Sequence, residues 1–386
     1  MVASGISWID PKTEQVLRWG ADYGPYTLDK QYWRLFTSMF LHFGIIHILA
    51  NMWCLWSLGR LSERLLGSFT TAGLYLLTGM GASLLSLSWD PMRVSAGASG
   101  AIFGIAGALI TVLYYGQLNL PKQSVRSLLG YVVRFCLLNL FFGLQARVDN
   151  MAHLGGMVTG LLMGLFLART FNSPAEDRAT QCRTIFAVST LVLLVLFIPV
   201  AKAKAYAVEY GKGQTAFDRK DYNAAIEHLQ EYVAARPDDA FGHELLGGAF
   251  QNTGRFDDAI REYEHGLAIN PDSHYIQVNL AGLYLRENKS DKAVALYRKG
   301  IPRIQASAHT LYFYGKALKQ TGDLDGAEEA LRKSVQLDDK QAYVHDLLAE
   351  VLQAEGKTVE AQAESKRAGE LDASKEADED RPQKKH

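Results

Sequence analysis

The sequence predicts an all-α chain in which a polytopic transmembrane helical bundle is followed by an α-solenoid. Two observations support this fold class. Residues 35–201 hold a series of long uncharged apolar runs, whereas the chain from Lys202 onward is charged and rich in helix-forming Ala, Glu, Lys and Leu. In this second half, small residues recur every 34 positions, which is typical of stacked helix pairs. The 386 residues leave room for two or three domains.

Composition argues against several functional classes. A formal net charge of -1 gives no electrostatic footprint for nucleic acid. The three cysteines, Cys54, Cys136 and Cys182, have neither a pairing pattern nor a metal-binding spacing. The sequence also contains no HExxH motif and no phosphate-binding loop. We therefore expect no metal, no cofactor and no nucleic-acid partner.

Six apolar runs predict membrane spans, since a spanning helix needs about 20 predominantly apolar residues. The fourth run is the weakest because Arg134 interrupts it, although this side chain can reach the interface from near one end. The runs are 35–59, 69–89, 94–121, 127–146, 151–168 and 184–201. They indicate a multi-pass protein surrounded by the lipid bilayer.

The basic residues predict the orientation of these spans, because cytoplasmic connections carry an excess of Lys and Arg. With the first span running inward, the inner connections 59–68, 117–134 and 169–183 hold eight basic residues. The outer connections 90–97 and 146–150 hold two, Arg93 and Arg147. Both chain ends are therefore expected outside the cytoplasm, in a protein of the bacterial cytoplasmic (inner) membrane.

These patterns divide the chain into six segments. We expect, in order, an extracytoplasmic loop, a membrane core, a cytoplasmic linker, an additional transmembrane helix, a set of repeats, and a charged tail that is disordered because it lacks an apolar face. The segments are 1–34, 35–170, 171–183, 184–201, 206–373 and 374–386.

Four polar residues in the apolar runs need a partner or a task, since polar groups are costly inside a bilayer. His47 and Asn51 are four residues apart and share one helix face. Ser99 and His153 lie just inside the same outer boundary, and no carboxylate lies beside either within the spans. Together the four fit a nucleophile, a base and two polar donors, as in a serine–histidine dyad.

Each piece also has a simpler interpretation. A GASG motif alone usually marks close helix packing, and a lone histidine in a span fits a helix-bonding or ion-relay role. Gly156 and Gly160 are best interpreted as packing glycines that bring the His153 helix against the Ser99 helix. Gly97 and Gly100 allow close approach of the backbone around Ser99.

In combination, the motifs resemble the rhomboid family of intramembrane serine proteases. The matching stretches cover about residues 20–170 and read YWRLFTSMFLHFGIIHILANMW, LGRLSERLLGS, GASGAIFG and AHLGGMVTG. The resemblance implies that Ser99 is the nucleophile and His153 the general base. It also implies an oxyanion hole formed by His47, Asn51 and the backbone N–H of Ser99.

The resemblance further assigns supporting residues. Phe103 takes the position of an aromatic side chain that stacks on the base, and Glu63 matches a structural carboxylate. Trp33 and Arg34 match a signature in the loop before the first span. Members of the family usually carry another span before this loop, so residues 1–5 could be its stub.

Residues 206–373 resemble about five tetratricopeptide repeats. Alanines recur at 225, 259, 293, 327 and 361, and a second small residue recurs at 213, 247, 281, 315 and 349. Such residues let paired helices approach closely, so that stacked pairs bury a shared core. The resemblance implies a concave groove for a protein or peptide partner, with self-association as the alternative.

The function we expect is that of an intramembrane serine endopeptidase that cleaves transmembrane segments of membrane proteins. Its extracytoplasmic repeats would recruit the substrate or an adaptor. The alternative is a catalytically inactive rhomboid-like adaptor that binds client proteins through its repeats, but the intact polar set argues against it. A transporter that used His153 as a proton relay would need an acidic partner within the spans, and the sequence has none there.

Overall fold

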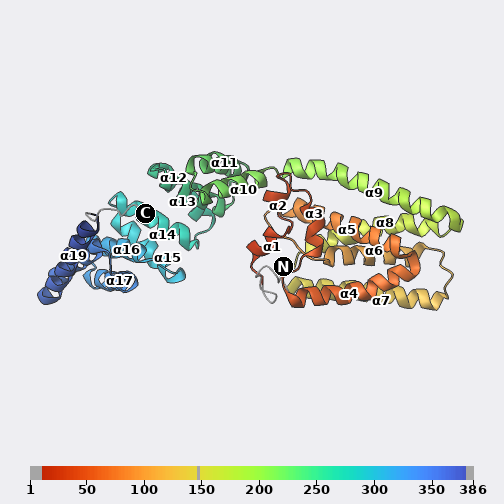
Figure 1. Ribbon diagram of the computed structural model, residues 1–386, viewed down its shortest axis with the longest axis horizontal. Helices are drawn as coiled ribbons and strands as arrows, with labels where there is room; N and C mark the ends of the chain where they lie inside the picture. The colour runs from red at the N-terminus through yellow and green to blue at the C-terminus, as the bar shows by residue number, and fades with distance from the viewer. Residues whose placement is uncertain (1–10, 146–147, 380–386) are drawn as a thin grey trace, which may run out of the picture. The chain divides into compact units, whose positions relative to one another are not determined.

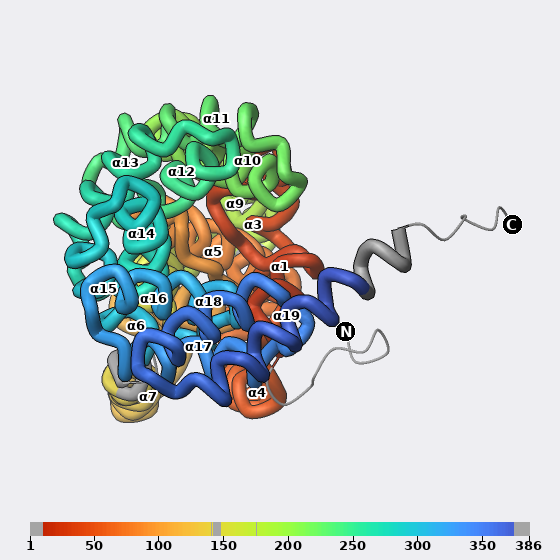
Figure 2. Tube along the Cα trace, turned by 90° about the vertical axis from the view of Figure 1, so that its left-hand side faces the viewer, coloured from red at the N-terminus to blue at the C-terminus, as the bar shows by residue number. Residues whose placement is uncertain are grey.

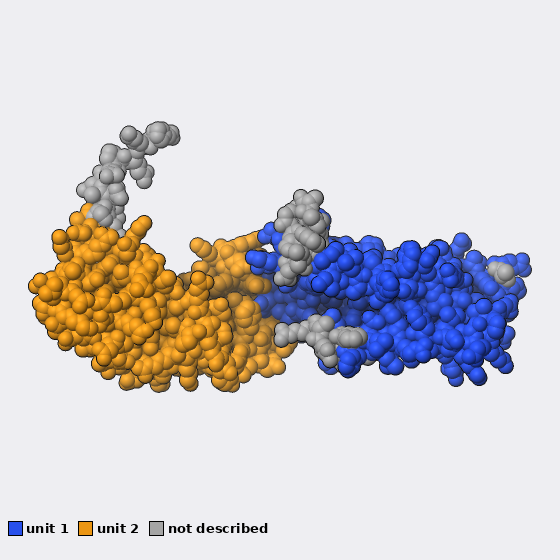
Figure 3. Space-filling model, turned by 90° about the horizontal axis from the view of Figure 1, so that it is seen from below, with its two compact units in different colours: residues 1–212 blue, residues 213–386 orange. Residues whose placement is uncertain are grey.

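The computed structural model describes residues 11–145 and 148–379. All regular secondary structure in these residues is helical, and the only other pairing is an isolated antiparallel bridge between Asp22 and Ser95. The chain divides into two compact units, Met1–Lys212 and Gly213–His386 (Figure 3). The all-α prediction is therefore confirmed, and each unit is described by itself below.

The segment before the long helices folds into short helices rather than an open loop. It contains α1 (Thr13–Arg18), α2 (Gly24–Thr27), α3 (Arg34–Thr37) and the 3₁₀ helix η2 (Ser38–Phe40). Arg34 is buried, and its guanidinium donates to the backbone carbonyls of Leu17 and Ala21. One side chain therefore joins the end of α1 to the start of α3. The expected stub at residues 1–5 lies outside the described residues.

Six long helices make up most of the rest of the first unit, which ends at Lys212 inside α10 (Tyr206–Asp218) (Figure 1). They are α4 (Ile45–Leu66), α5 (Ser68–Trp89), α6 (Ser99–Tyr115), α7 (Lys122–Gln145), α8 (Asn150–Thr170) and α9 (Ala175–Ala203). Helix α6 packs against α4, α5, α7 and α8, and almost all of its side chains are buried. It is the central helix of this unit, which agrees with its lack of any charged residue.

Not all six helices have the length and composition of a membrane span. Among the described residues, α5, α8 and α9 qualify, and the bent pair of α3–η2 and α4 makes a fourth if it counts as one span. Helix α6 is apolar but has only 17 residues. Helix α7 contains Lys122, Arg126 and Arg134, which lower its hydropathy. Six spans therefore stay a prediction.

The first and third apolar runs break where the sequence predicts continuous helix. Residues 35–59 are expected to be one span, yet the chain turns by 92° between η2 and α4. Gly44 allows this turn because its φ of 94° lies in the left-handed region, which favours glycine. Similarly, residues 94–98 form a loop, and α6 begins only at Ser99.

Helix α9 also differs from its expected bounds. The sequence predicts a linker over 171–183 and a separate helix over 184–201, but one helix runs through most of both. Glu176 and Asp177 lie in its first turn, where carboxylates favour a helix start. The apolar stretch of α9 is 0% buried in the protein. This surface fits contact with lipid.

Glycines bring α6 and α8 unusually close together. A Cβ atom at Gly156 would lie 1.9 Å from the carbonyl oxygen of Gly100, and one at Gly160 would lie 1.9 Å from that of Gly104. No side chain fits at such distances, so the two backbones are in direct contact. The packing role predicted for these glycines matches this geometry.

The remaining helices follow one another along the chain as five pairs, and their labels can be followed in Figure 2. The pairs are α10 (Tyr206–Asp218) with α11 (Tyr222–Ala235), α12 (Ala240–Asn252) with α13 (Phe256–Ile269), α14 (His274–Arg286) with α15 (Ser290–Gly300), α16 (Ala308–Thr321) with α17 (Leu324–Leu337), and α18 (Ala342–Ala354) with α19 (Thr358–Glu379). A short 3₁₀ helix, η3 (Ile301–Arg303), follows α15. Each pair corresponds to one 34-residue period.

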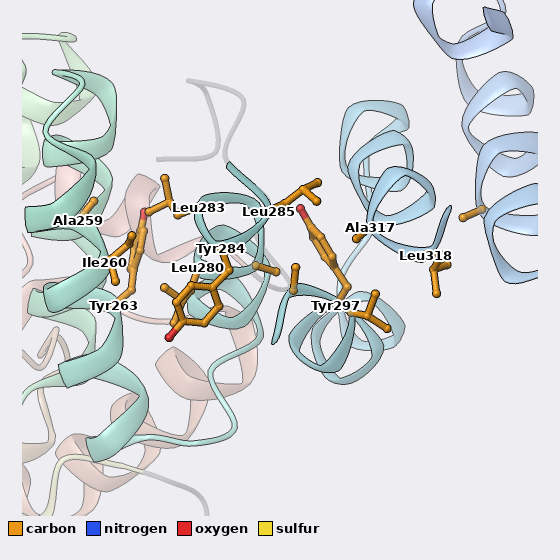
Figure 4. Close-up of a cluster of buried hydrophobic side chains, with 14 of the residues drawn as sticks. Ala259, Ile260, Tyr263, Leu280, Leu283, Tyr284, Leu285, Tyr297, Ala317 and Leu318 are labelled. Atoms are coloured by element: carbon orange, nitrogen blue, oxygen red, sulfur yellow. The ribbon is translucent and has the colours of Figure 1, made fainter. Parts of the chain in front are cut away.

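Capping and small residues explain why this half folds into pairs. The side chains of Asp221, Asp239 and Asp323 each accept a backbone N–H at a helix start. The periodic alanines at 225, 259, 293 and 327 are 0% exposed. Large side chains such as Tyr263, Leu280 and Tyr297 fill the space between the pairs (Figure 4). The predicted α-solenoid is therefore confirmed.

The end of the chain differs from the prediction. Residues 374–386 are expected to be disordered, but α19 continues to Glu379. Residues 380–386 lie outside the described part. Ala and Glu, both good helix formers, dominate the end of α19 and account for its extension.

Candidate active site

The hydroxyl of Ser99 and the imidazole of His153 are in contact. Ser99 is the first residue of α6, and His153 lies in the first turn of α8. The distance from Ser99 Oγ to His153 Nε2 is 2.8 Å, a normal hydrogen bond. The close packing of α6 on α8 places both side chains at the same end of the helix pair. Two of the predicted site residues are thus brought together.

An aromatic ring and not a carboxylate orients His153. The ring of Phe103, one turn after Ser99, stacks on the imidazole with centroids 4.4 Å apart and an angle of 14°. Nδ1 of His153 is buried and has no hydrogen-bond partner among the described residues. If Ser99 donates to Nε2, the ring proton lies on Nδ1. Among the described residues, no third side chain is hydrogen-bonded to this serine–histidine pair.

Asp149 is the carboxylate that sequence reasoning overlooked beside this site. It is the N-cap of α8, where its Oδ1 accepts the N–H of Ala152 at 3.0 Å. Its Oδ2 accepts the hydroxyl of Ser86 at 2.5 Å. An Asp before a helical run is a standard N-cap signal, so its position was detectable. The two contacts hold the start of α8, and thereby His153, against α5.

His47 turns a hydrogen-bond donor toward the space beside Ser99. The backbone N–H of Phe43 donates to His47 Nδ1 at 3.2 Å, so a neutral ring carries its proton on Nε2. A Cβ atom at Gly97 would lie 3.2 Å from this Nε2 and 3.7 Å from Ser99 Oγ. Gly97 also has a φ of 144°, which side chains rarely adopt. Glycine is required here on both grounds.

Asn51 lies one turn beyond His47 on α4 and is buried. Its amide nitrogen donates to the carbonyl of His47 at 2.8 Å. A side-chain amide has two N–H groups, so the second remains for another acceptor. Asn51 lines a cavity of about 170 Å³ together with His47, Ser99, Phe103 and His153.

A larger cavity of about 510 Å³ also borders Ser99. Its lining includes Ser38, Phe43, Ile46, His47, Gly97 and Ser99. His47 and Ser99 line both cavities, so the serine lies where the two meet. The combined space has room for several residues of an extended peptide and contains both apolar and polar walls.

Residues outside the predicted set hold the loop 94–98 in front of Ser99. The backbone N–H of Ala98 donates to His42 Nε2 at 3.4 Å. Asp22 and Ser95 exchange backbone hydrogen bonds of 2.9 and 2.8 Å. Burial raises the pKa of the Asp22 carboxyl to about 7. His42 was visible in an apolar run, whereas no sequence signal marks Asp22.

The other predicted supporting residues lie in three different surroundings, and of these only Gly100 is next to the serine in the sequence. The Arg34 guanidinium lies over the ring of Trp33, 4.8 Å from its centroid, and ties the loop helices together. Gly100 packs on α5, where a Cβ would lie 2.5 Å from that of Ala82. Glu63 is exposed near the end of α4, and its side chain makes no hydrogen bond or ion pair to the described residues. A contact for this carboxylate is therefore not observed.

Comparison with known families supports the two-part organisation. The family profile "Rhomboid domain" matches residues 29–170. Two tetratricopeptide repeat profiles match residues 252–312 and 308–341. The first match covers both cavities and the site residues above except Asp22, and the other two fall within the helix pairs.

Several curated relatives are similar to this chain. The rhomboid protease GluP of Bacillus subtilis is 30% identical over 68% of this chain and 50% of its own length. The rhomboid protease AarA of Providencia stuartii is 30% identical over 48% of this chain and 73% of its own. RHOMBOID-like protein 1 of Arabidopsis thaliana is 40% identical over 36% of this chain and 35% of its own. The chain thus spans about half the length of GluP, the first of these relatives.

Solved structures of MamA proteins are similar to part of this chain. MamA from Desulfovibrio magneticus RS-1 is 21% identical, with 45% of this chain and 96% of that chain covered and a TM-score of 0.39. At this TM-score the likeness carries no argument. The family is shown instead by the profile match over residues 29–170 and by the 30% identity to AarA over 73% of that relative. The chain therefore belongs to the rhomboid family and carries tetratricopeptide repeats after its membrane domain.

Proposed function

We propose that the protein is an intramembrane serine endopeptidase that cleaves transmembrane segments of other membrane proteins. The observation that carries this proposal is the 2.8 Å contact between Ser99 Oγ and His153 Nε2 at the junction of two cavities. A serine hydroxyl is a weak nucleophile unless an adjacent base takes its proton. The imidazole is positioned for that step.

In the acylation step, Ser99 Oγ attacks the carbonyl carbon of the scissile peptide bond while its proton moves to His153 Nε2. The tetrahedral intermediate then collapses, the C–N bond breaks, and the imidazolium returns the proton to the leaving amine. Water attacks the resulting ester in the same way, with His153 as base. This second half releases a carboxylic acid and regenerates the hydroxyl of Ser99.

The negative charge of the tetrahedral intermediate needs preformed donors. His47 Nε2–H, the second N–H of Asn51 and the backbone N–H of Ser99 are assigned to this role. Ser99 is the first residue of α6, and the N–H groups at a helix start have no partner within the helix. In a site shielded from bulk water, such donors stabilise an oxyanion far more than water does.

The alternative is an inactive rhomboid-like adaptor. An adaptor has no need for a serine within hydrogen-bonding distance of a histidine, or for an aromatic ring that fixes the histidine plane. It also has no need for a donor fixed by the Phe43–His47 contact. These three features together favour the enzyme.

Replacement of the dyad tests the proposal. Ser99→Ala and His153→Ala should each abolish cleavage of a model transmembrane substrate by the purified protein, because the two side chains act as a unit. Ser95→Ala is the matched control, since Ser95 lines the larger cavity but does not contact His153 through a hydrogen bond. A fluorophosphonate should label the wild type and Ser95→Ala but not Ser99→Ala. If either dyad variant retained most of the wild-type activity, this mechanism would be excluded.

The repeat domain is proposed to recruit the substrate or an adaptor through a cavity of about 420 Å³ between α12 and α16. Arg286, His309 and Lys316 contribute basic groups to its lining, and no carboxylate lines it. Acidic residues outnumber basic ones in the repeats as a whole, so this basic patch is a local feature. Phe256, Tyr297 and Phe313 add aromatic walls. The chemistry suits an acidic peptide that carries an apolar side chain.

We place the protein in a bacterial cytoplasmic membrane with its repeats outside the cytoplasm. The support is the excess of basic residues on the inner connections and the single apolar helix α9 before the repeats. The repeats and the Ser99 end of α6 would then face the same compartment. Protease added to intact spheroplasts should digest the repeats, whereas protection of a tag at residue 386 would reverse this topology.

A further inference from the structure

A cluster of three metal-ligating side chains lies in the second helix pair of the repeats. His243 is on α12, and Glu262 and His265 are one turn apart on α13. One ligand atom from each residue lies within 4.8 Å of the others. The ring planes of the two histidines are nearly perpendicular, with centroids 5.6 Å apart. Imidazole nitrogen and carboxylate oxygen are typical ligands of Zn²⁺.

The hydrogen bonds of His243 leave one ring nitrogen directed at the carboxylate. Its Nε2 lies 3.2 Å from the carbonyl oxygen of Pro237 and must carry a proton, because a carbonyl only accepts. Its Nδ1 lies 2.7 Å from Glu262 Oε2. In a neutral ring, two lone pairs would face each other there. A proton shared by the two atoms, or a metal ion bound to both of them, would relieve this repulsion.

The residues equivalent to His243 in other repeats show which of its contacts form without a metal ion. One repeat later, Gln277 donates to the carbonyl of Pro271 at 2.6 Å. Three repeats later, His345 pairs with the carbonyl of Asp339 and with Glu364, as His243 does with its partners. The contact with a backbone carbonyl is thus shared by three of the five repeats and does not depend on a metal. The pairing of histidine with glutamate needs no further ligand.

His265 is what distinguishes the second helix pair from the last one. At the equivalent position of the last pair stands Arg367, whose guanidinium lies near Asp339 and Glu370 instead. A proton between His243 and Glu262 is fully satisfied by these two residues. A metal ion binds further ligands, and His265 can supply one. The N–H···O=C contact of His243 is also the usual way in which a second group orients a metal-binding histidine.

We propose that His243, Glu262 and His265 bind Zn²⁺ or a cation of the same class, with water at the fourth position. Zn–N and Zn–O bonds of about 2.0–2.2 Å require ligand atoms roughly 3.3 Å apart in a tetrahedron. The 2.7 Å between His243 Nδ1 and Glu262 Oε2 is shorter than this, so metal binding requires the partly exposed Glu262 side chain to move back. His265 is exposed, so its side chain can turn inward to complete the site. The ion would join the two helices of one repeat. This metal-binding proposal does not depend on the proposed protease activity.

Two reciprocal substitutions test the site in the full-length protein. His265→Arg gives the second helix pair the residue found at this position in the last pair. Arg367→His makes the reverse change in the last pair. The metal-free proteins in detergent are titrated with ZnCl₂ by calorimetry, and their thermal unfolding is followed by circular dichroism. A ligand that binds only the folded state stabilises it, so the melting of the repeats reports occupancy.

We expect His265→Arg to bind one Zn²⁺ fewer than the wild type and to lose the zinc-dependent rise in melting temperature. Arg367→His should bind one Zn²⁺ more, since His345 and Glu364 are already in place. The comparison between variants removes any contribution from other histidines. MgCl₂ should shift no melting curve, because Mg²⁺ prefers oxygen ligands. Equal zinc stoichiometry and equal thermal shifts in the wild type and His265→Arg would overturn the proposal.

Discussion

At the scale of single residues, one backbone hydrogen bond decides what His47 can do. The N–H of Phe43 occupies Nδ1, so the proton of the neutral ring is available on Nε2 beside Ser99. An imidazole without this contact could take either tautomer and would present a donor only part of the time. The sharp turn between η2 and α4 places Phe43 over the ring of His47.

We expect His47→Ala and Asn51→Ala each to lower turnover by about one to three decades without eliminating it. The reason is that both side chains stabilise charge and form no bond to the substrate, and loss of one oxyanion donor typically costs about 10²–10³ in rate. The measurement is kcat on a model transmembrane substrate, with thermal stability as the control for folding. An unchanged kcat in the double variant would reassign both residues to helix packing.

Asp22 gives a prediction for pH. Its carboxyl is buried, Thr27 donates to Oδ1 at 2.6 Å, and Oδ2 has no hydrogen-bond partner among the described residues. Its pKa is raised from 3.8 to about 7, so between these values the folded state keeps a proton that the unfolded state has lost. Asp149 raises this pKa further and Arg34 lowers it. The contribution of Asp22 therefore becomes less favourable as pH rises from about 4 to about 7, and levels off above.

Asp22→Asn should remove this contribution, because the amide resembles the protonated carboxyl. Thermal unfolding of the detergent-solubilised protein is compared from pH 4 to pH 8. The stability of the variant relative to wild type should rise over this interval, whereas the exposed Asp29→Asn should follow the wild-type curve. A constant difference between Asp22→Asn and wild type across the whole range would show that Asp22 does not titrate in it.

At the scale of elements, the contact of α6 with α8 positions the dyad. Because Gly156 meets the carbonyl of Gly100, the relative height of the two helices is fixed one turn below His153. The glycine spacing in GASG and HLGGMVTG was sufficient to predict this contact from the sequence. Small residues at four-residue intervals leave few other ways to pack two apolar helices.

We expect Gly156→Ala to destabilise the membrane domain by about 1–3 kcal/mol, as overpacking of a close interface does. It should also reduce kcat, because the added methyl separates α8 from α6 and moves His153 away from Ser99. Gly130→Ala is the matched control: Gly130 also lies inside a helix, and nothing lies within 4 Å of a Cβ there. This control should be neutral or stabilising by up to about 1 kcal/mol. If both variants behave alike, the glycine contact does not position the dyad.

Other elements could not be predicted so well from the sequence. The run 35–59 has no charge that would mark a break, and the turn before Ile45 depends on the left-handed backbone of Gly44. Helix α9 begins nine residues before the apolar run because charged residues are equally compatible with a helix outside the membrane. Asp22 and Ser95 meet through their backbones, which leave no trace in side-chain patterns. Hydrophobicity therefore predicted which helices exist, while backbone contacts set where they end.

At the scale of the whole molecule, the two units have separate cores. Hydrophobic clusters form within the membrane helices and within the repeats. Residues 206–212 belong to the first unit, where a Cβ at Gly211 would lie 2.7 Å from that of Pro25. A truncation that spares the membrane domain should therefore begin at residue 213.

Deletion of 213–386 should slow cleavage of a natural substrate more than that of a short generic one. A tethered substrate meets the active site at a higher effective concentration, and loss of the tether affects only substrates that use it. The ratio of kcat/KM for the two substrates, truncated against full-length, is the measurement. An equal loss for both would leave the repeats with a stabilising role alone.

The stacking of the repeats has a consequence for how this half comes apart. Each described helix from α11 to α19 makes its extensive contacts with helices no more than two places along the chain. Loss of one pair therefore removes support only from the adjacent pairs, and the free energy of unfolding is a sum of local couplings. Such an array opens in steps from its ends rather than all at once. Amide protons in α18 and α19 should exchange with solvent sooner than those in α13 and α14, long before the array unfolds as a whole.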